Sequence, residues 1–143
     1  MIEMSDKSAR DLQLLASLRL EDARVLHAQN RFSGAYYLAG SAIECALKAI
    51  IAQSFQAAVI PEKRYVDRIF THDLKALLEL SGLRQRFEID AKGSAELRSA
   101  WASVTAWNEA SRYEVVDPFR AAEMIEAVGN ETYGVLQWLM QRW

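Results

Sequence analysis

The stretch SGAYYLAGSAIECALKAIIAQSF, residues 33–55, decides the fold. Its formal charges are Glu44 and Lys48, and most of its other side chains are apolar. With about 100° of rotation per residue, an α-helix places four polar side chains on one narrow stripe: Tyr37, Ser41, Glu44 and Lys48. A helix that is apolar over so much of its circumference must be covered by several neighbours. The stretch therefore predicts the central helix of a bundle, with Ser33 as its N-cap.

Segments on both sides of this helix have helical patterns of their own. Apolar residues recur every three to four positions in 8–30, 94–108 and 117–142, which predicts three more long helices. Gly129 weakens the last of them by about 1 kcal/mol relative to alanine and permits a kink there. The short turn after Asn30 makes the first two helices antiparallel neighbours.

The rest of the chain supplies short elements and connections. Thr71 is placed to cap a short helix that ends at Gly82, and Asp73 is favourable in its first turn. The other expected segments are a long connection at 56–70, a second one at 83–93 and a non-periodic stretch at 109–116. With no strand pattern in the sequence, we expect a single all-α domain over residues 1–143.

Composition limits the function classes. The 143 residues carry 17 basic and 19 acidic side chains, a net charge of −2, which argues against a nucleic-acid coat. The single Cys45 excludes an intrachain disulfide, and its place on the central helix predicts a buried small hydrophobe. The amino-terminal residues lack the long apolar segment of a secretory signal, and no run approaches the roughly 20 apolar residues of a membrane span. We expect a cytoplasmic protein without a membrane anchor.

Metal and cofactor chemistry has little support. His27, His72 and Cys45 do not form a spaced ligand cluster, and the chain has no glycine-rich phosphate loop. The sequence therefore predicts neither a metal site nor a cofactor.

The candidate ligand-binding residues come from three segments. Glu44 and Lys48, four apart with the acid first, form either a pair at the edge of the buried face or part of a polar slot between helices. His72 either completes the start of the short helix or faces a pocket rimmed by Arg112. The Arg112 guanidinium binds either a phosphate or the carbonyls at a helix end. The full candidate set is Tyr37, Ser41, Glu44, Lys48, His72, Arg112 and Tyr113.

Three phrases of the chain resemble the HEPN domain family of bacteria and archaea. They are AYYLAGSAIECALKA at 35–49, THDL at 71–74 and W-x5-W-x4-R-Y at 101–113, in that order. The resemblance extends from about residue 12 to residue 139. It implies an up-and-down bundle of four long helices with short accessory ones, usually dimeric. Family members often act beside a small nucleotidyltransferase in toxin–antitoxin or defence modules, and many are metal-independent ribonucleases.

The ribonuclease motif of that family is an arginine followed, after four to six residues, by a histidine. After Arg112 the three possible positions hold Asp117, Pro118 and Phe119, and no arginine lies at the matching distance before His27 or His72. The general acid–base group is therefore missing from the motif. We expect no ribonuclease activity of this type.

These inferences lead to two main hypotheses, and an enzyme that uses unrecognised residues stays open as a third. The first is a non-catalytic HEPN-type module that binds a nucleotide or a nucleotidyltransferase partner beside the central helix, in a toxin–antitoxin or defence module. Lys48 and Arg112 would meet phosphate, and a tyrosine ring would stack on a base. The alternative is a homodimeric helical interaction protein without a small-molecule ligand. Both allow a homodimer, and neither favours nucleic acid as a partner.

Overall fold

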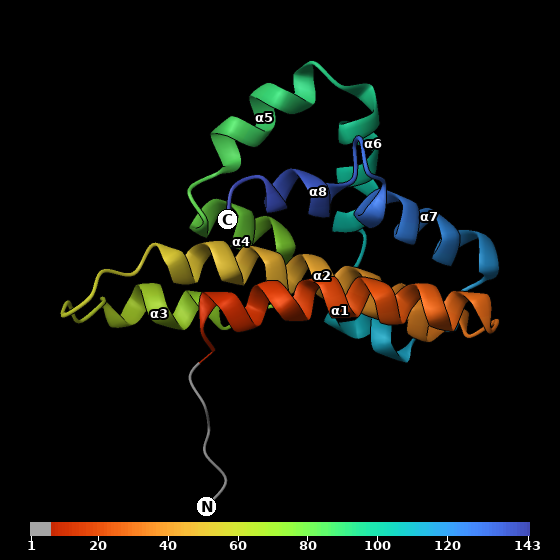
Figure 1. Ribbon diagram of the computed structural model, residues 1–143, viewed down its shortest axis with the longest axis horizontal. Coiled ribbons are helices and arrows are strands. Elements are labelled where there is room, and N and C mark those ends of the chain that lie inside the picture. Colours follow the sequence, from red (N-terminus) through yellow and green to blue (C-terminus); the bar gives the residue numbers. More distant parts are fainter. Residues whose placement is uncertain (1–6) are drawn as a thin grey trace, which may run out of the picture.

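A helical hairpin forms the base of the molecule. The computed structural model describes residues 7–143. The expectation that the amino-terminal residues lack a secretory signal therefore concerns residues that lie in part outside the described range. Helix α1 (Ala9–Ala28) begins at Ser8, whose side chain accepts a hydrogen bond from the Asp11 amide at 3.1 Å. Asn30, at φ 61°, turns the chain into α2 (Phe32–Gln53), which runs back antiparallel to α1 (Figure 1). The predicted antiparallel pair is confirmed.

Helix α2 lies at the centre of the packing. Half of its residues are buried, and it packs against α1, α4, η1, α7 and α8. By length and composition α2 is also apolar enough to cross a membrane, and it is the one such helix within residues 7–143. We did not expect a segment of this length and composition from the sequence. Its burial accounts for that composition, because a core helix must be apolar on nearly all sides. The prediction of a central helix is confirmed, and the cytoplasmic location stays a prediction.

The remaining described elements are also helical, as expected for an all-α fold (Figure 1). Helix α6 packs against α7, and α7 packs against both α1 and α2, so four longer helices share one core. No strand occurs in the part of the chain that the structure describes. The elements after α2 are α3 (Lys63–Ile69), α4 (Leu74–Leu80), α5 (Arg84–Lys92), α6 (Ala95–Thr105), the 3-10 helix η1 (Glu109–Tyr113), α7 (Pro118–Gly129) and α8 (Val135–Met140).

Three segments differ from the sequence-based expectation. The connections expected at 56–70 and 83–93 contain α3 and α5, and the stretch at 109–116 contains η1. Each of α3 and α5 turns only a narrow apolar face to the core; on α5 the buried residues are Phe87 and Ala91. Two apolar residues four apart are too few to produce a helical periodicity.

The last expected helix is interrupted. A turn at 130–134 separates α7 from α8, so the chain does more than kink near Gly129. The Asn130 side chain accepts hydrogen bonds from the amides of Thr132 and Tyr133, and the Gly134 amide donates to the Asn130 carbonyl. Asparagine favours such local bonds over a continuing helix.

The predicted N-caps Ser33 and Thr71 are wrong, whereas the predicted glycine at the end of α4 is confirmed. Ser33 lies inside α2, where its hydroxyl accepts a hydrogen bond from the Val116 amide at 2.9 Å, so it ties a distant segment instead of capping. Asp73, not Thr71, caps α4, accepting from the amides at positions 75 and 76. Gly82, at φ +80°, follows the end of α4 as predicted, in a conformation that favours glycine.

Candidate functional site

The polar stripe of α2 lies at the boundary between core and solvent. Tyr37, Ser41, Glu44 and Lys48 are all partly exposed, whereas their neighbours Ala42, Ala46 and Leu47 and most of the helix around them are buried. The rotation of the helix therefore leaves this one line of polar side chains within reach of the segments that follow.

Glu44 is the centre of a hydrogen-bonded group on this stripe. Its Oε1 lies 2.7 Å from Nδ1 of His72, and its Oε2 accepts a bond from Nζ of Lys48 at 3.3 Å. The Glu44 and Lys48 side chains are 16% and 19% exposed. The structure therefore brings together three predicted residues, Glu44, Lys48 and His72. Because both oxygens of the Glu44 carboxylate already have partners, the three side chains bond to one another and do not line an open slot.

Glu109 of η1 extends this group toward Arg112. Its Oε1 lies 3.8 Å from Nε2 of His72 and 3.5 Å from Nη2 of Arg112. The ring of His72 therefore lies between the carboxylates of Glu44 and Glu109. The sequence did not single out Glu109, although its position three residues before Arg112 in a helical turn was a usable signal.

Trp107 fixes this region to α2. Its indole Nε1 donates to the Tyr37 carbonyl at 3.1 Å, and the two rings lie 5.5 Å apart. The ring also covers Gly40, where an added Cβ would overlap it. Such close approach requires glycine. Trp107 and Gly40 were not candidate site residues, because neither carries a group typical of catalysis or ligand binding.

Arg112 and Tyr113 face outward from this anchor. The Arg112 guanidinium carbon lies 4.9 Å from the centre of the Tyr113 ring, and Tyr113 is 78% exposed. The Tyr113 side chain, first, and the Glu109 carboxylate raise the pKa of Arg112 above its ordinary value, so this side chain keeps its charge. Of the seven predicted residues, Tyr113 is the one most open to solvent.

The segment after η1 is also tied to α2. Arg120 donates to Glu114 at 2.7 Å and to the Tyr36 hydroxyl at 3.1 Å, and it lies over the Tyr36 ring. Val116 is buried and bonded to Ser33. In contrast, Tyr113, Val115 and Phe119 have exposed fractions of 78%, 97% and 80%. A fixed backbone therefore presents three large apolar side chains to solvent.

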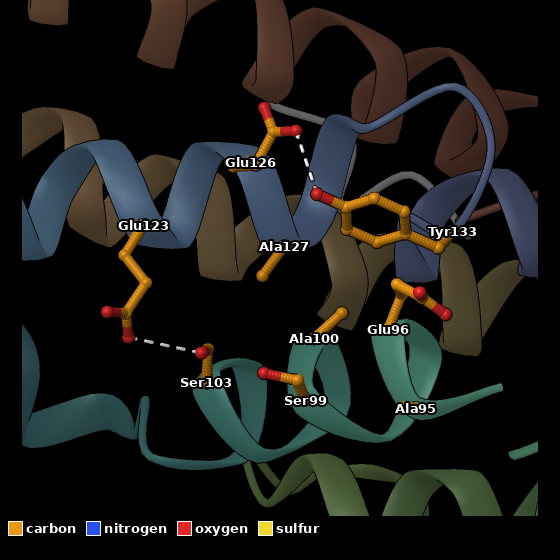
Figure 2. Close-up of a pocket in the computed structure, with 9 residues that line it drawn as sticks. All are labelled: Ala95, Glu96, Ser99, Ala100, Ser103, Glu123, Glu126, Ala127 and Tyr133. Atoms are coloured by element: carbon orange, nitrogen blue, oxygen red, sulfur yellow. Dashed lines mark hydrogen bonds between the residues drawn. The ribbon is translucent and has the colours of Figure 1, made fainter.

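A hollow in the surface between α6 and α7 is lined by none of the predicted residues. Figure 2 shows this hollow, of about 380 Å³, with Tyr133 at one end. Its carboxylates already have protein donors: Glu126 accepts from the Tyr133 hydroxyl at 3.0 Å and Glu123 from Ser103 at 3.1 Å. The bond to Glu126 raises the pKa of Tyr133. Neither Glu44 nor Arg112 lines this hollow.

A metal centre has no support from the geometry. Within residues 7–143, no three His, Cys, Asp or Glu side chains are arranged to hold a metal ion. The ring of His27 packs edge-on against the ring of Phe32, with 5.4 Å between the ring centres.

The comparisons with known proteins agree with the resemblance seen in the sequence. No curated protein and no solved structure matches the chain with significance. The family model described as HEPN domain matches residues 9–143, which includes every predicted helix and the whole Glu44 group. Because the match covers nearly the whole chain, this helical protein belongs to the HEPN domain family.

Proposed function

We propose that this HEPN domain is a non-catalytic module that binds a small nucleotidyltransferase through the surface of Tyr113, Val115 and Phe119. The supporting observation is the contrast within residues 108–120, which are tied to α2 by the Val116 amide and the Arg120 side chain while these three side chains face solvent. Exposed apolar groups on a preorganised backbone are typical of interaction surfaces, since little conformational entropy is lost on binding. A toxin–antitoxin or defence module is the setting that the family suggests.

The charged residues of the Glu44 group support binding over catalysis. Lys48 and Arg112 are paired with Glu44 and Glu109, so neither cation faces solvent without a carboxylate beside it. Asp117, at the first position where the ribonuclease motif requires histidine, caps α7 by accepting from the Arg120 amide at 2.8 Å. The role that we assign to the group is to hold η1 and the 70–73 segment against α2.

The test is co-expression and co-purification with a small nucleotidyltransferase of the same genome, followed by calorimetry of the purified pair. We expect a complex that Val115→Asp or Phe119→Asp weakens by about tenfold or more, because a charge replaces an apolar contact at the interface. Val25→Asp is the matched control, since Val25 is a 64%-exposed valine on α1. Equal losses in Val115→Asp and Val25→Asp, or no complex at all, would refute the proposal.

A nucleotide is the second candidate ligand, because the exposed Tyr113 ring lies beside the Arg112 guanidinium. A base stacked on tyrosine and a phosphate on arginine would use both groups. Titration with ATP should then release heat that Arg112→Ala abolishes.

Light scattering of the protein alone tests the homodimer. If the homodimer used the surface of Tyr113, Val115 and Phe119, Val115→Asp should dissociate it.

A further inference from the structure

A second surface feature is a cleft that none of the predicted site residues lines. The cleft, of about 890 Å³, opens between α4, α5 and α6. Figure 1 shows α5 at the edge of the molecule, joined to α4 at one end and to α6 at the other. Residues of all three helices line the cleft, together with Asp73 at the start of α4.

The walls of the cleft are whole helix faces. The lining residues of α5 and of α6 each recur at spacings of three and four, from Arg84 to Lys92 and from Arg98 to Thr105. Residues with this spacing lie on one side of a helix. At about 1.5 Å per residue, the α5 wall is about 12 Å long, or two helical turns. A groove of this length between two helices has the shape that receives a third helix.

The floor of the cleft is aromatic. Phe87 is buried, and its ring lies 5.0 Å from the rings of both Trp101 and Trp138. Trp101 is only partly buried, so part of its indole faces the cleft. Leu78 and Ala91 complete an apolar surface that an apolar side chain could cover.

The rim carries more positive than negative charge, although the chain as a whole is acidic. Four cations line the cleft against three carboxylates. Asp73 is already engaged by the first amides of α4, and Arg98 donates to the last carbonyls of α5. Among residues 7–143, Lys75, Arg84 and Lys92 form no ion pair; the facing carboxylates are Glu79 and Glu88.

We propose that this cleft docks an acidic amphipathic helix of a partner protein, about two turns long. The apolar face of that helix covers the exposed part of Trp101, and its carboxylates pair with Lys75, Arg84 and Lys92. The proposal goes beyond the function proposed above, since none of Tyr113, Val115 and Phe119 lines the cleft. Each surface is tested by its own variants, so either proposal can fail while the other holds.

The experiment uses the full chain and two fluorescein-labelled peptides of about 16 residues, in which leucines recur every three to four positions. The first peptide carries glutamates on its flanks and the second carries lysines at the same positions. Fluorescence anisotropy measures the affinity of each peptide for the wild type and for Arg84→Glu/Lys92→Glu. The matched control is Lys63→Glu/Arg64→Glu, which reverses two exposed cations on α3.

The expected result is a charge exchange. The glutamate peptide binds the wild type and loses about tenfold or more in affinity to Arg84→Glu/Lys92→Glu, which gains affinity for the lysine peptide. The α3 variant binds the glutamate peptide as the wild type does. Trp101→Leu weakens binding without reversing the preference, and circular dichroism verifies that each variant is folded.

Three outcomes would overturn the proposal. They are no binding of the glutamate peptide at about 1 mM, equal affinity of the two peptides for the wild type, and equal losses in the α5 and α3 variants. Binding of naphthalene-2-sulfonate in the cleft, without binding of the peptide, would assign it to a small aromatic anion and would also refute a helical occupant.

Discussion

Helices α2 and α5 are attached to the domain in opposite ways. Helix α2 buries half of its residues and packs against five other elements, and the two charged side chains of its stripe, Glu44 and Lys48, have hydrogen-bond partners inside the protein. Helix α5 buries only Phe87 and Ala91, and its charged residues Arg84, Glu88 and Lys92 face solvent or the cleft. The difference indicates that α2 determines the fold, whereas most side chains of α5 remain available for contacts at the surface of the molecule.

The strongest test of this contrast is to change a glycine in each region. Gly40→Val places a branched side chain where Trp107 covers α2, and we expect a loss of about 3 kcal/mol in the free energy of unfolding. Gly93→Ala, at the end of α5, adds a Cβ that meets its nearest atom at an ordinary 3.6 Å. That change should stay within about 0.5 kcal/mol. Urea denaturation measures both, and similar losses would mean that α2 and the end of α5 are equally constrained.

Hydrogen exchange tests the same contrast without a mutation. Because few apolar contacts hold α5, its amides should exchange through local opening, while those of α2 exchange only when the domain unfolds. We expect protection factors on the order of 30-fold lower in α5 than in α2, which corresponds to about 2 kcal/mol. Equal protection in the two helices would show that α5 unfolds together with the core.

The sequence predicted the parts of the fold that bury the most apolar surface. Residues 33–55 have an apolar surface too wide for anything but a central helix, and α1 and α6 have clear three-to-four periodicity. Helices α3 and α5 were missed because their contacts with the core are so few. The break before α8 depends on side-chain bonds of Asn130 that no periodicity reveals.

For the site, the helical spacing predicted that Glu44 and Lys48 lie side by side, and the structure shows them hydrogen-bonded. His72, from a separate segment, also contacts Glu44. The spacing of Glu109 and Arg112 could have indicated their contact, but the contact of Glu109 with His72, 37 positions earlier in the chain, is one that a single sequence does not reveal. Likewise, Gly40 is informative only once Trp107 is known to lie over it. Sequence patterns indicated which side chains share a helix face, whereas contacts between segments required the structure.

The hydrogen bond between Glu44 and His72 should be worth more than an exposed contact of equal length between charged side chains. A double-mutant cycle with Glu44→Gln and His72→Gln should give a coupling of about 1 kcal/mol, because Glu44 is largely buried. The control is Lys63 with Asp67, also 2.7 Å apart but 88% and 59% exposed, where we expect about 0.3 kcal/mol or less. Equal couplings would mean that the Glu44 group contributes no more than a surface pair.

The smallest expected effect concerns the thiol of Cys45, which lies on α2 beside Glu44 and is partly exposed instead of fully buried as predicted. Burial, first, and the negative charge of Glu44, second, raise its pKa above the ordinary value. Since the thiolate is the reactive form, the pH at which alkylation by iodoacetamide reaches half its maximal rate should lie above that of a free cysteine. Glu44→Gln removes the second cause and should move this midpoint part of the way down.

The control for this experiment is Glu109→Gln. The Glu109 carboxylate also lies beside His72, but it is not among the charges that shift the pKa of Cys45. The midpoint should stay unchanged in that variant. If both variants lowered it equally, the shift would come from loosening of the segments that cover α2 and not from the charge of Glu44. The titration therefore distinguishes a direct electrostatic effect on the central helix from a change in how tightly its neighbours pack against it.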